Sequence, residues 1–244
     1  MEREDISEHI SQQFNLEMED LRNKVLTMGG IVEKNIADAI TSVIEGDSDL
    51  AEKVSSEDLK VNAMEVAIDE ECARVLARRQ PAAGDLRVIT MIIKTITDLE
   101  RIGDEAEKIA RMGITLNDAK RDSLRGHFVE LRHLAESVRR MLRDALDAFA
   151  RMDVKTACTC IEYDDTVDEE YEAIMRQLIT HMMEDPRNIR RTLDVIWCTR
   201  SLERIGDHSK NVCEYIIYMV SGKDIRHLSL DEIEFGEKGE QKVS

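Results

Sequence analysis

Six residues occur twice in this chain, and each copy carries two carboxylates. Both copies read Leu-Glu-Arg-Ile-Gly-Asp, the first beginning at Leu99 and the second 103 positions later. The glutamate and the aspartate are four positions apart, so on a helix they lie on one face. Carboxylates held this close repel one another unless a cation or a proton lies among them. The pairs that need such a partner are Glu100 with Asp104 and Glu203 with Asp207.

Further oxygen-bearing side chains fall in core positions of the helix before each motif. Asp58 and Asp164 interrupt apolar lines that have three- and four-residue spacing, and an oxygen-bearing residue follows each of them by one helical turn. A proline turn joins each of these helices to the motif helix, and at about 1.5 Å per residue the positions come level across the helix pair. We therefore expect two clusters. The first cluster is Asp58, Asn62, Glu100 and Asp104, and the second cluster is Asp164, Asp168, Glu203 and Asp207.

Oxygen-rich clusters of this kind suit hard metal ions. Carboxylate and amide oxygens bind magnesium and manganese, and they also serve iron and zinc in oxygen-rich sites. The sequence thus predicts divalent or iron metal ions as cofactors, without selecting among iron, manganese, magnesium and zinc. Two other interpretations stay open. Arg101 and Arg204, each inside a motif, could neutralise the acids in a metal-free helical scaffold, and a bound metal could instead serve a hydrolase or an oxidase.

The enzyme interpretation finds little support among the other residues. The sequence shows no nucleophile with a neighbouring base and no glycine-rich loop of the P-loop form. A ferritin-like di-iron bundle needs two Glu-x-x-His motifs, and only Glu130 with His133 matches. His208 follows Asp207 and could join the second cluster. We therefore expect a protein without catalytic residues.

Long amphipathic helices must position these residues. Apolar residues recur three and four positions apart, and no alternating strand pattern persists for more than a few residues. Turn signals occur at Gly46, Pro81 and Pro186. The apolar patterns cover about residues 7–45, 49–79, 85–110, 131–149, 160–181 and 188–219, and residues 112–122 read as the link between the two halves.

The repeated motif implies a duplicated structural unit. The expected fold is all-α, with two homologous three-helix bundles side by side. The first bundle would cover residues 1–114 and the second 115–222, followed by a polar tail at 223–244 that we expect to be mobile. Gly29 and Gly30 lie inside the first helix and predict a kink or a close helix contact, and Gly103 lets another helix approach its own. Trp197 is expected in the core.

Composition and charge narrow the class of protein. The chain has 244 residues, of which 35% are charged and 4% aromatic, and its formal net charge is −17. This charge repels a nucleic-acid backbone. No apolar run reaches the roughly 18 to 20 residues of a membrane span, and the charged N-terminus does not resemble a signal peptide. Five cysteines without zinc-like spacing favour reduced thiols in a cytoplasmic protein.

The doubled motif, together with Gln80-Pro-Ala-Ala-Gly-Asp-Leu-Arg87 and Ile109-Ala110, closely resembles the PhoU family of phosphate-transport regulators. The resemblance extends from about Phe14 to Met219. It implies two homologous three-helix bundles with Glu-x-x-x-Asp and Asp-x-x-x-Asp motifs, which in some members bind iron clusters or other divalent metals. The matching pairs are Glu100/Asp104, Glu203/Asp207 and Asp164/Asp168. Asn62 replaces the acid expected after Asp58, which makes the second cluster the stronger candidate.

The resemblance also implies a function. Family members are not enzymes, and they repress the phosphate-starvation response when phosphate is plentiful. They link the ATP-binding subunit of a high-affinity phosphate ABC importer to a sensor histidine kinase, and they restrain uptake. They are commonly cytoplasmic homodimers that reach the inner face of the membrane through these partners.

Overall fold

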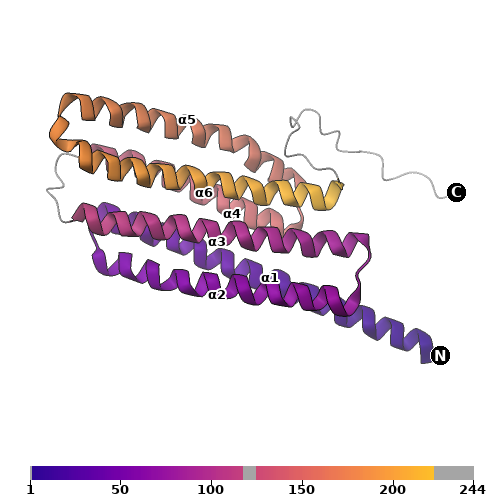
Figure 1. The fold of residues 1–244 in the computed structure, drawn as a ribbon. Coiled ribbons are helices and arrows are strands. Elements are labelled where there is room, and N and C mark those ends of the chain that lie inside the picture. Colours follow the sequence, from indigo (N-terminus) through magenta and orange to yellow (C-terminus); the bar gives the residue numbers. More distant parts are fainter. Residues whose placement is uncertain (1, 118–124, 223–244) are drawn as a thin grey trace.

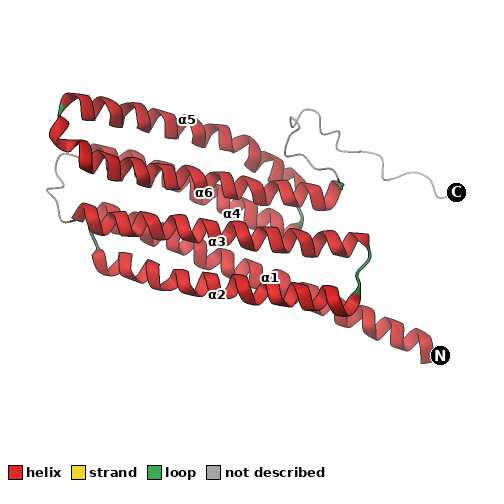
Figure 2. Ribbon diagram, in the orientation of Figure 1, coloured by secondary structure: helices red, strands yellow, loops and turns green. Residues whose placement is uncertain are grey.

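The computed structural model describes residues 2–117 and 125–222, and helices make up nearly all of this part of the chain (Figures 1 and 2). No strand occurs in it, so the predicted all-α class is confirmed. Five of the six long helices exceed 30 residues. The elements are α1 (Glu2–Glu45), α2 (Ser48–Arg79), α3 (Ala83–Asn117), α4 (Arg125–Arg151), α5 (Val154–Glu184), the short 3-10 helix η2 (Pro186–Asn188) and α6 (Ile189–Ser221).

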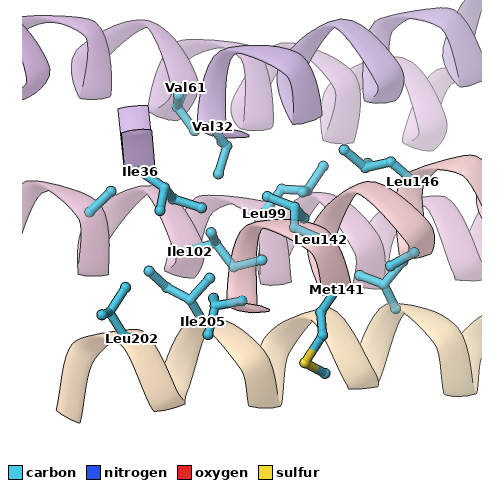
Figure 3. Close-up of a cluster of buried hydrophobic side chains, with 14 of the residues drawn as sticks. Val32, Ile36, Val61, Leu99, Ile102, Met141, Leu142, Leu146, Leu202 and Ile205 are labelled. Carbon is cyan, nitrogen blue, oxygen red and sulfur yellow. The ribbon is translucent and has the colours of Figure 1, made fainter. Parts of the chain in front are cut away.

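The helices form two three-helix bundles that lie side by side (Figure 1). Helices α1, α2 and α3 pack together, as do α4, α5 and α6, and the halves meet where α3 packs against α6 and α1 against α4. Apolar side chains of both halves form one continuous core (Figure 3). Val32, Leu99, Leu142 and Ile205 are completely buried in it. The predicted arrangement is confirmed.

The duplication extends to the turn that begins the second helix of each half. Gly46 and Met152 are 106 positions apart, and both have left-handed backbone, with φ of 76° and 53°. The next residues, Asp47 and Asp153, have nearly the same backbone angles and accept hydrogen bonds from main-chain N–H groups of the following helix. Such N-caps satisfy donors that a helix end leaves free. An offset of 106 therefore relates α1 and α2 to α4 and α5.

Helix α3 is longer than the sequence pattern indicated. Residues 112–122 were expected to form the link, but α3 continues through Gly113 to Asn117. A Cβ atom at position 113 would lie 3.1 Å from Val43 Cγ2 on α1, so this glycine serves close helix packing rather than a helix end. The proposed boundary after residue 114 thus falls inside a helix.

Three other expectations have different outcomes. Trp197 was expected in the core, but 57% of it is exposed, so that prediction is wrong. Four of the five cysteines are buried and all five are free, as expected for reduced thiols. The tail predicted for 223–244 and the end of the predicted link lie outside the described residues.

Adjacent glycines in α1 provide a matched test of the packing between the halves. A Cβ atom at Gly29 would lie 2.5 Å from Leu146 Cδ2 of α4, whereas one at Gly30 would meet nothing within 4 Å. The predicted close contact is therefore observed.

We expect Gly30→Ala to raise the free energy of unfolding by about 0.5–1 kcal/mol through helix propensity. We expect Gly29→Ala to lower it by about 1 kcal/mol, because Leu146 must shift. Urea denaturation of both variants tests this, and equal shifts would contradict it.

Candidate functional site

The first cluster lies between α2 and α3, and its centre is buried. Asp58 is only 5% exposed, and a Cβ atom at Gly103 would lie 3.0 Å from its Oδ1. The glycine of the motif thus leaves room for this carboxylate. Asn62 Nδ2 donates a hydrogen bond to Asp58 Oδ2 at 3.2 Å. Among the residues that the structure describes, neither Asp58 Oδ1 nor Asn62 Oδ1 has a hydrogen-bond partner, and both are buried, so the cluster holds two unsatisfied oxygens there.

Burial and neighbouring carboxylates raise the pKa values of two acids of the first cluster, Asp58 and Glu100. Burial and then the charge of Asp104 raise the pKa of both Asp58 and Glu100 above the ordinary values of 3.8 and 4.5. Glu65, which the sequence prediction did not include, belongs to the same group, because burial and then Asp69 raise its pKa and Glu65 in turn raises that of Glu100. Its place on the apolar face of α2, one turn beyond Val61, was the signal for it.

The second cluster lies between α5 and α6 and contains a cation of its own. Lys210 Nζ donates a hydrogen bond to the buried Asp164 Oδ2 at 2.7 Å. Arg200 Nη1 lies 3.4 Å from Glu203 Oε1. Asp168 and Asp207 are exposed at the rim of this interface. Lysine and arginine therefore neutralise part of this cluster.

The carboxylates of the second cluster still show mutual repulsion. Burial raises the pKa of Glu203, and Asp207 raises it further. Although Asp168 and Asp207 reach solvent at the rim, the loss of hydration beside the helix interface and then the charge of Asp164 raise the pKa of both. All eight predicted residues thus lie at the two interfaces where helix spacing placed them, while metal binding by them stays a prediction.

The two clusters differ most at one pair of equivalent positions. Lys210 lies three residues after the second motif, and Glu107 occupies that position after the first. Glu107 adds to the rise in the pKa of Asp58, and its own partner is Arg111, whose Nη2 lies 2.6 Å from Glu107 Oε1. The first cluster therefore has an acid where the second has an ammonium group. This favours the first cluster as the cation site, the reverse of the expectation that Asn62 suggested.

The donor atoms of the first cluster fit a hard cation in kind, but the side chains do not converge on one point. Carboxylate and amide oxygens are suitable ligands, and two of them are unsatisfied. Across residues 2–117 and 125–222, no group of three or more His, Cys, Asp or Glu side chains is arranged so that it could hold a metal ion. Binding would therefore require Asp58, Glu100 and Asp104 to turn toward a common point.

Of the three residues that the sequence placed beside the clusters, two contact other groups and the third is exposed. Arg204 Nη1 lies 2.7 Å from Glu105 Oε1, so it does not neutralise the second cluster as considered. Arg101 is exposed and offsets only part of the rise in the pKa of Glu100. His208 is buried, and its Nδ1 lies 2.7 Å from Asp98 Oδ1, so it does not join the second cluster.

These contacts reveal a polar network between the halves that sequence reasoning missed. His208 binds Asp98, and Ser201 Oγ donates a hydrogen bond to Glu105 Oε2 at 2.8 Å. All four residues are buried. Asp98 and Ser201 directly precede the two motifs, whereas Glu105 and His208 directly follow them. Each contact therefore joins the residue before one motif to the residue after the other, as two-fold symmetry between α3 and α6 requires.

The raised pKa values give stability a definite pH dependence. A folded-state carboxyl pKa above its ordinary value means that the folded chain binds more protons, so stability rises as pH falls through that pKa. We expect the urea midpoint to rise as pH falls from about 8 toward about 5. The control is Asp58→Asn/Glu100→Gln, which should show a smaller rise because two of the responsible groups are gone. Equal pH profiles for both proteins would contradict this origin.

The geometry defines a class of protein: a duplicated helical bundle whose halves share one core and repeat one acidic motif. Residues 25–112 and 131–216 each match the PhoU domain family. The chain therefore belongs to the PhoU family. None of the helices within the described ranges is long and apolar enough to cross a membrane.

Individual relatives agree with this assignment along most of the chain. The chain is 56% identical over 228 residues to the phosphate-specific transport system accessory protein PhoU homolog of Pseudomonas putida, covering 93% of this chain and 88% of that protein. It is 49% identical over 234 residues to the phosphate-specific transport system accessory protein PhoU of Escherichia coli K12, covering 96% of each. The crystal structure of PhoU from Pseudomonas aeruginosa matches with a TM-score of 0.82 at 54% identity, covering 86% of this chain and all of that one. The phosphate transport system regulatory protein PhoU of Streptococcus pneumoniae matches with a TM-score of 0.78 at 28% identity, covering 86% and 98%.

Proposed function

We propose that this protein is a non-enzymatic, cytoplasmic regulator of phosphate uptake and signalling. It represses the phosphate-starvation response by linking the ATP-binding subunit of a phosphate ABC importer to a sensor histidine kinase. The observation that carries this proposal is the family match in both halves, together with relatives that are named accessory proteins of the phosphate-specific transport system. Association with the membrane occurs through these partners, and the working form is a homodimer.

The proposal is tested in cells and with purified components. Deletion of this chain is expected to leave a phosphate-starvation promoter active in phosphate-rich medium, and the intact chain is expected to restore repression. Purified protein should co-elute in gel filtration with the ATP-binding subunit or with the cytoplasmic part of the kinase. Analytical ultracentrifugation measures the oligomeric state. Normal repression in the deletion strain, with no complex in either mixture, would refute the linking role.

We also propose that the first cluster binds a divalent or iron metal ion. Asp58, Glu100 and Asp104 would hold it, with Glu65 and Asn62 beside them, and the cation would offset their mutual repulsion. The unsatisfied oxygens of Asp58 and Asn62 support this proposal. The alternative, a metal-dependent hydrolase or oxidase, has less support. His208 would be a candidate ligand or base for such an enzyme, but it contacts Asp98 and neither cluster.

Elemental analysis of gently purified protein tests the metal proposal. The Glu100→Ala/Asp104→Ala variant is expected to lose the metal that the unaltered protein carries, because it removes two of the three proposed ligands and the repulsion that the cation would offset. The matched variant Glu203→Ala/Asp207→Ala should keep it, since Lys210 already neutralises Asp164. No metal in the unaltered protein, with a normal melting curve, would favour the metal-free scaffold. Loss in the second variant alone would assign the metal to the second cluster.

A further inference from the structure

A pocket between α4 and α5 lies outside the two acidic clusters. Its volume is about 430 Å³, and it opens to solvent in the second half of the molecule. Ala173 and the buried Ile174 contribute apolar surface, and Glu130, Glu136 and Glu170 contribute carboxylates. The pocket thus combines an apolar wall with several acids.

One of these carboxylates is held in place by a chain of hydrogen bonds. Tyr163 Oη donates to Ser137 Oγ at 3.3 Å, and Ser137 Oγ donates to Glu170 Oε1 at 3.2 Å. The other oxygen of this group, Glu170 Oε2, is buried and has no hydrogen-bond partner within the part of the chain that the structure describes. A buried charged acceptor without a partner is costly, and a cationic donor would satisfy it with a strong hydrogen bond.

The corresponding groove of the first half shows what the second half lacks. The offset of 106 places Lys24 at the position of Glu130, and Glu71 at that of Gln177. Lys24 Nζ binds Glu71 Oε2 at 2.5 Å across α1 and α2, so the first half supplies its own ammonium group at these positions. The position of Glu170 is occupied there by an apolar residue, Met64. The second half therefore replaces a lysine and a methionine by two glutamates.

The arginine on the pocket wall does not replace the missing cation. Arg140 lies over the ring of Tyr163, 5.0 Å from its centroid, and pairs with Asp144 on its own helix. His133 is exposed at the edge of the pocket. Glu170 thus lines a space that a ligand can enter, and no cation within the described residues pairs with its unsatisfied oxygen.

We propose that this pocket binds the guanidinium group of an arginine side chain from a partner protein. A guanidinium presents several N–H donors in one plane and can donate to Glu170, while its aliphatic stem packs on Ala173 and Ile174. The net charge of −17 favours approach of a basic segment. The identity of the arginine donor as a partner protein rests on the proposed function. The preference of the pocket for a guanidinium does not.

Titration with a small probe tests that preference without any partner. Acetyl-arginine-amide is added to the full chain, and backbone amide chemical shifts of α4 and α5 report binding. The control probe, acetyl-citrulline-amide, has nearly the same shape and no charge. Arginine is expected to bind at least about tenfold more tightly than citrulline, because only the guanidinium adds a full positive charge to its hydrogen bonds with the Glu170 carboxylate. Equal affinities would overturn the proposal.

Variants assign the effect to this pocket. Glu170→Gln keeps an acceptor for Ser137 and removes the charge, so it should weaken arginine binding at least about tenfold. The control Glu169→Gln changes an exposed neighbour and should leave it unaltered. The double variant Glu130→Lys/Gln177→Glu copies the Lys24–Glu71 pair and should abolish binding without lowering the melting temperature. Unchanged affinity in Glu170→Gln would overturn the proposal, as would full affinity in the folded double variant. Failure of the signalling proposal would leave these results intact, since the probe requires no partner.

Discussion

Lys210→Met is expected to lower the free energy of unfolding by about 2–3 kcal/mol. The lysine donates to Asp164, which is almost completely buried, and its removal leaves this carboxylate among the acids of the second cluster without a cation. Breaking a buried ion pair costs about 3–5 kcal/mol, and exposure of one third of the Lys210 side chain reduces that figure. Methionine retains most of the apolar stem, so the loss reports mainly on charge. Urea denaturation at constant pH measures it.

The control for this variant is Lys60→Met. Lys60 Nζ also lies close to a carboxylate, at 2.6 Å from Glu57 Oε1, but 63% of its side chain is exposed. A surface pair of this kind contributes about 0–1 kcal/mol, so the control should change stability little. The cost of Lys210→Met should also shrink as pH falls, because the acids of the second cluster then take up protons. Equal losses in both variants, or a loss that does not depend on pH, would contradict this role of Lys210.

His208→Ala is expected to lower the free energy of unfolding by about 3 kcal/mol. The variant removes the closest partner of the buried Asp98 and leaves it, within the described ranges, only the hydrogen bond from Asn211 Nδ2, at 3.1 Å. An underpaired buried carboxylate and a cavity in the packed interface both destabilise the fold. Because the contact joins α3 to α6, we also expect the two halves to unfold less cooperatively. Denaturation followed by circular dichroism and by Trp197 fluorescence measures both effects.

The symmetry-related contact provides the control. Ser201→Ala removes one hydrogen bond to Glu105, but Arg204 and Lys108 still bind that carboxylate, at 2.7 Å and 3.0 Å. The expected loss is therefore only about 1 kcal/mol. A double-mutant cycle between Asp98→Ala and His208→Ala isolates the energy of the direct contact. A coupling energy near zero, or a Ser201→Ala loss as large as that of His208→Ala, would show that the interface does not depend on this pair.

The sequence by itself determined the helices, their duplication and the positions of eight residues in the two clusters. Apolar spacing and turn residues act within a few positions, so α1 through α6 follow from local patterns. Helix rise and the proline turns then placed Asp58 level with Asp104. Gly29 and Gly103 indicated close helix contacts for the same reason, since a missing side chain has few uses inside a helix.

Only the tertiary structure decided which neighbouring helix is contacted by each polar residue at the edge of the apolar face of α6. Helix α6 packs against α3, α4 and α5, so a residue on the shoulder of its apolar stripe can turn to more than one partner. Arg204 and His208 turn to α3, whereas Lys210 turns to α5. Spacing along one helix does not fix that choice, because the free energy of a buried charge depends on the partner groups that other helices bring to it.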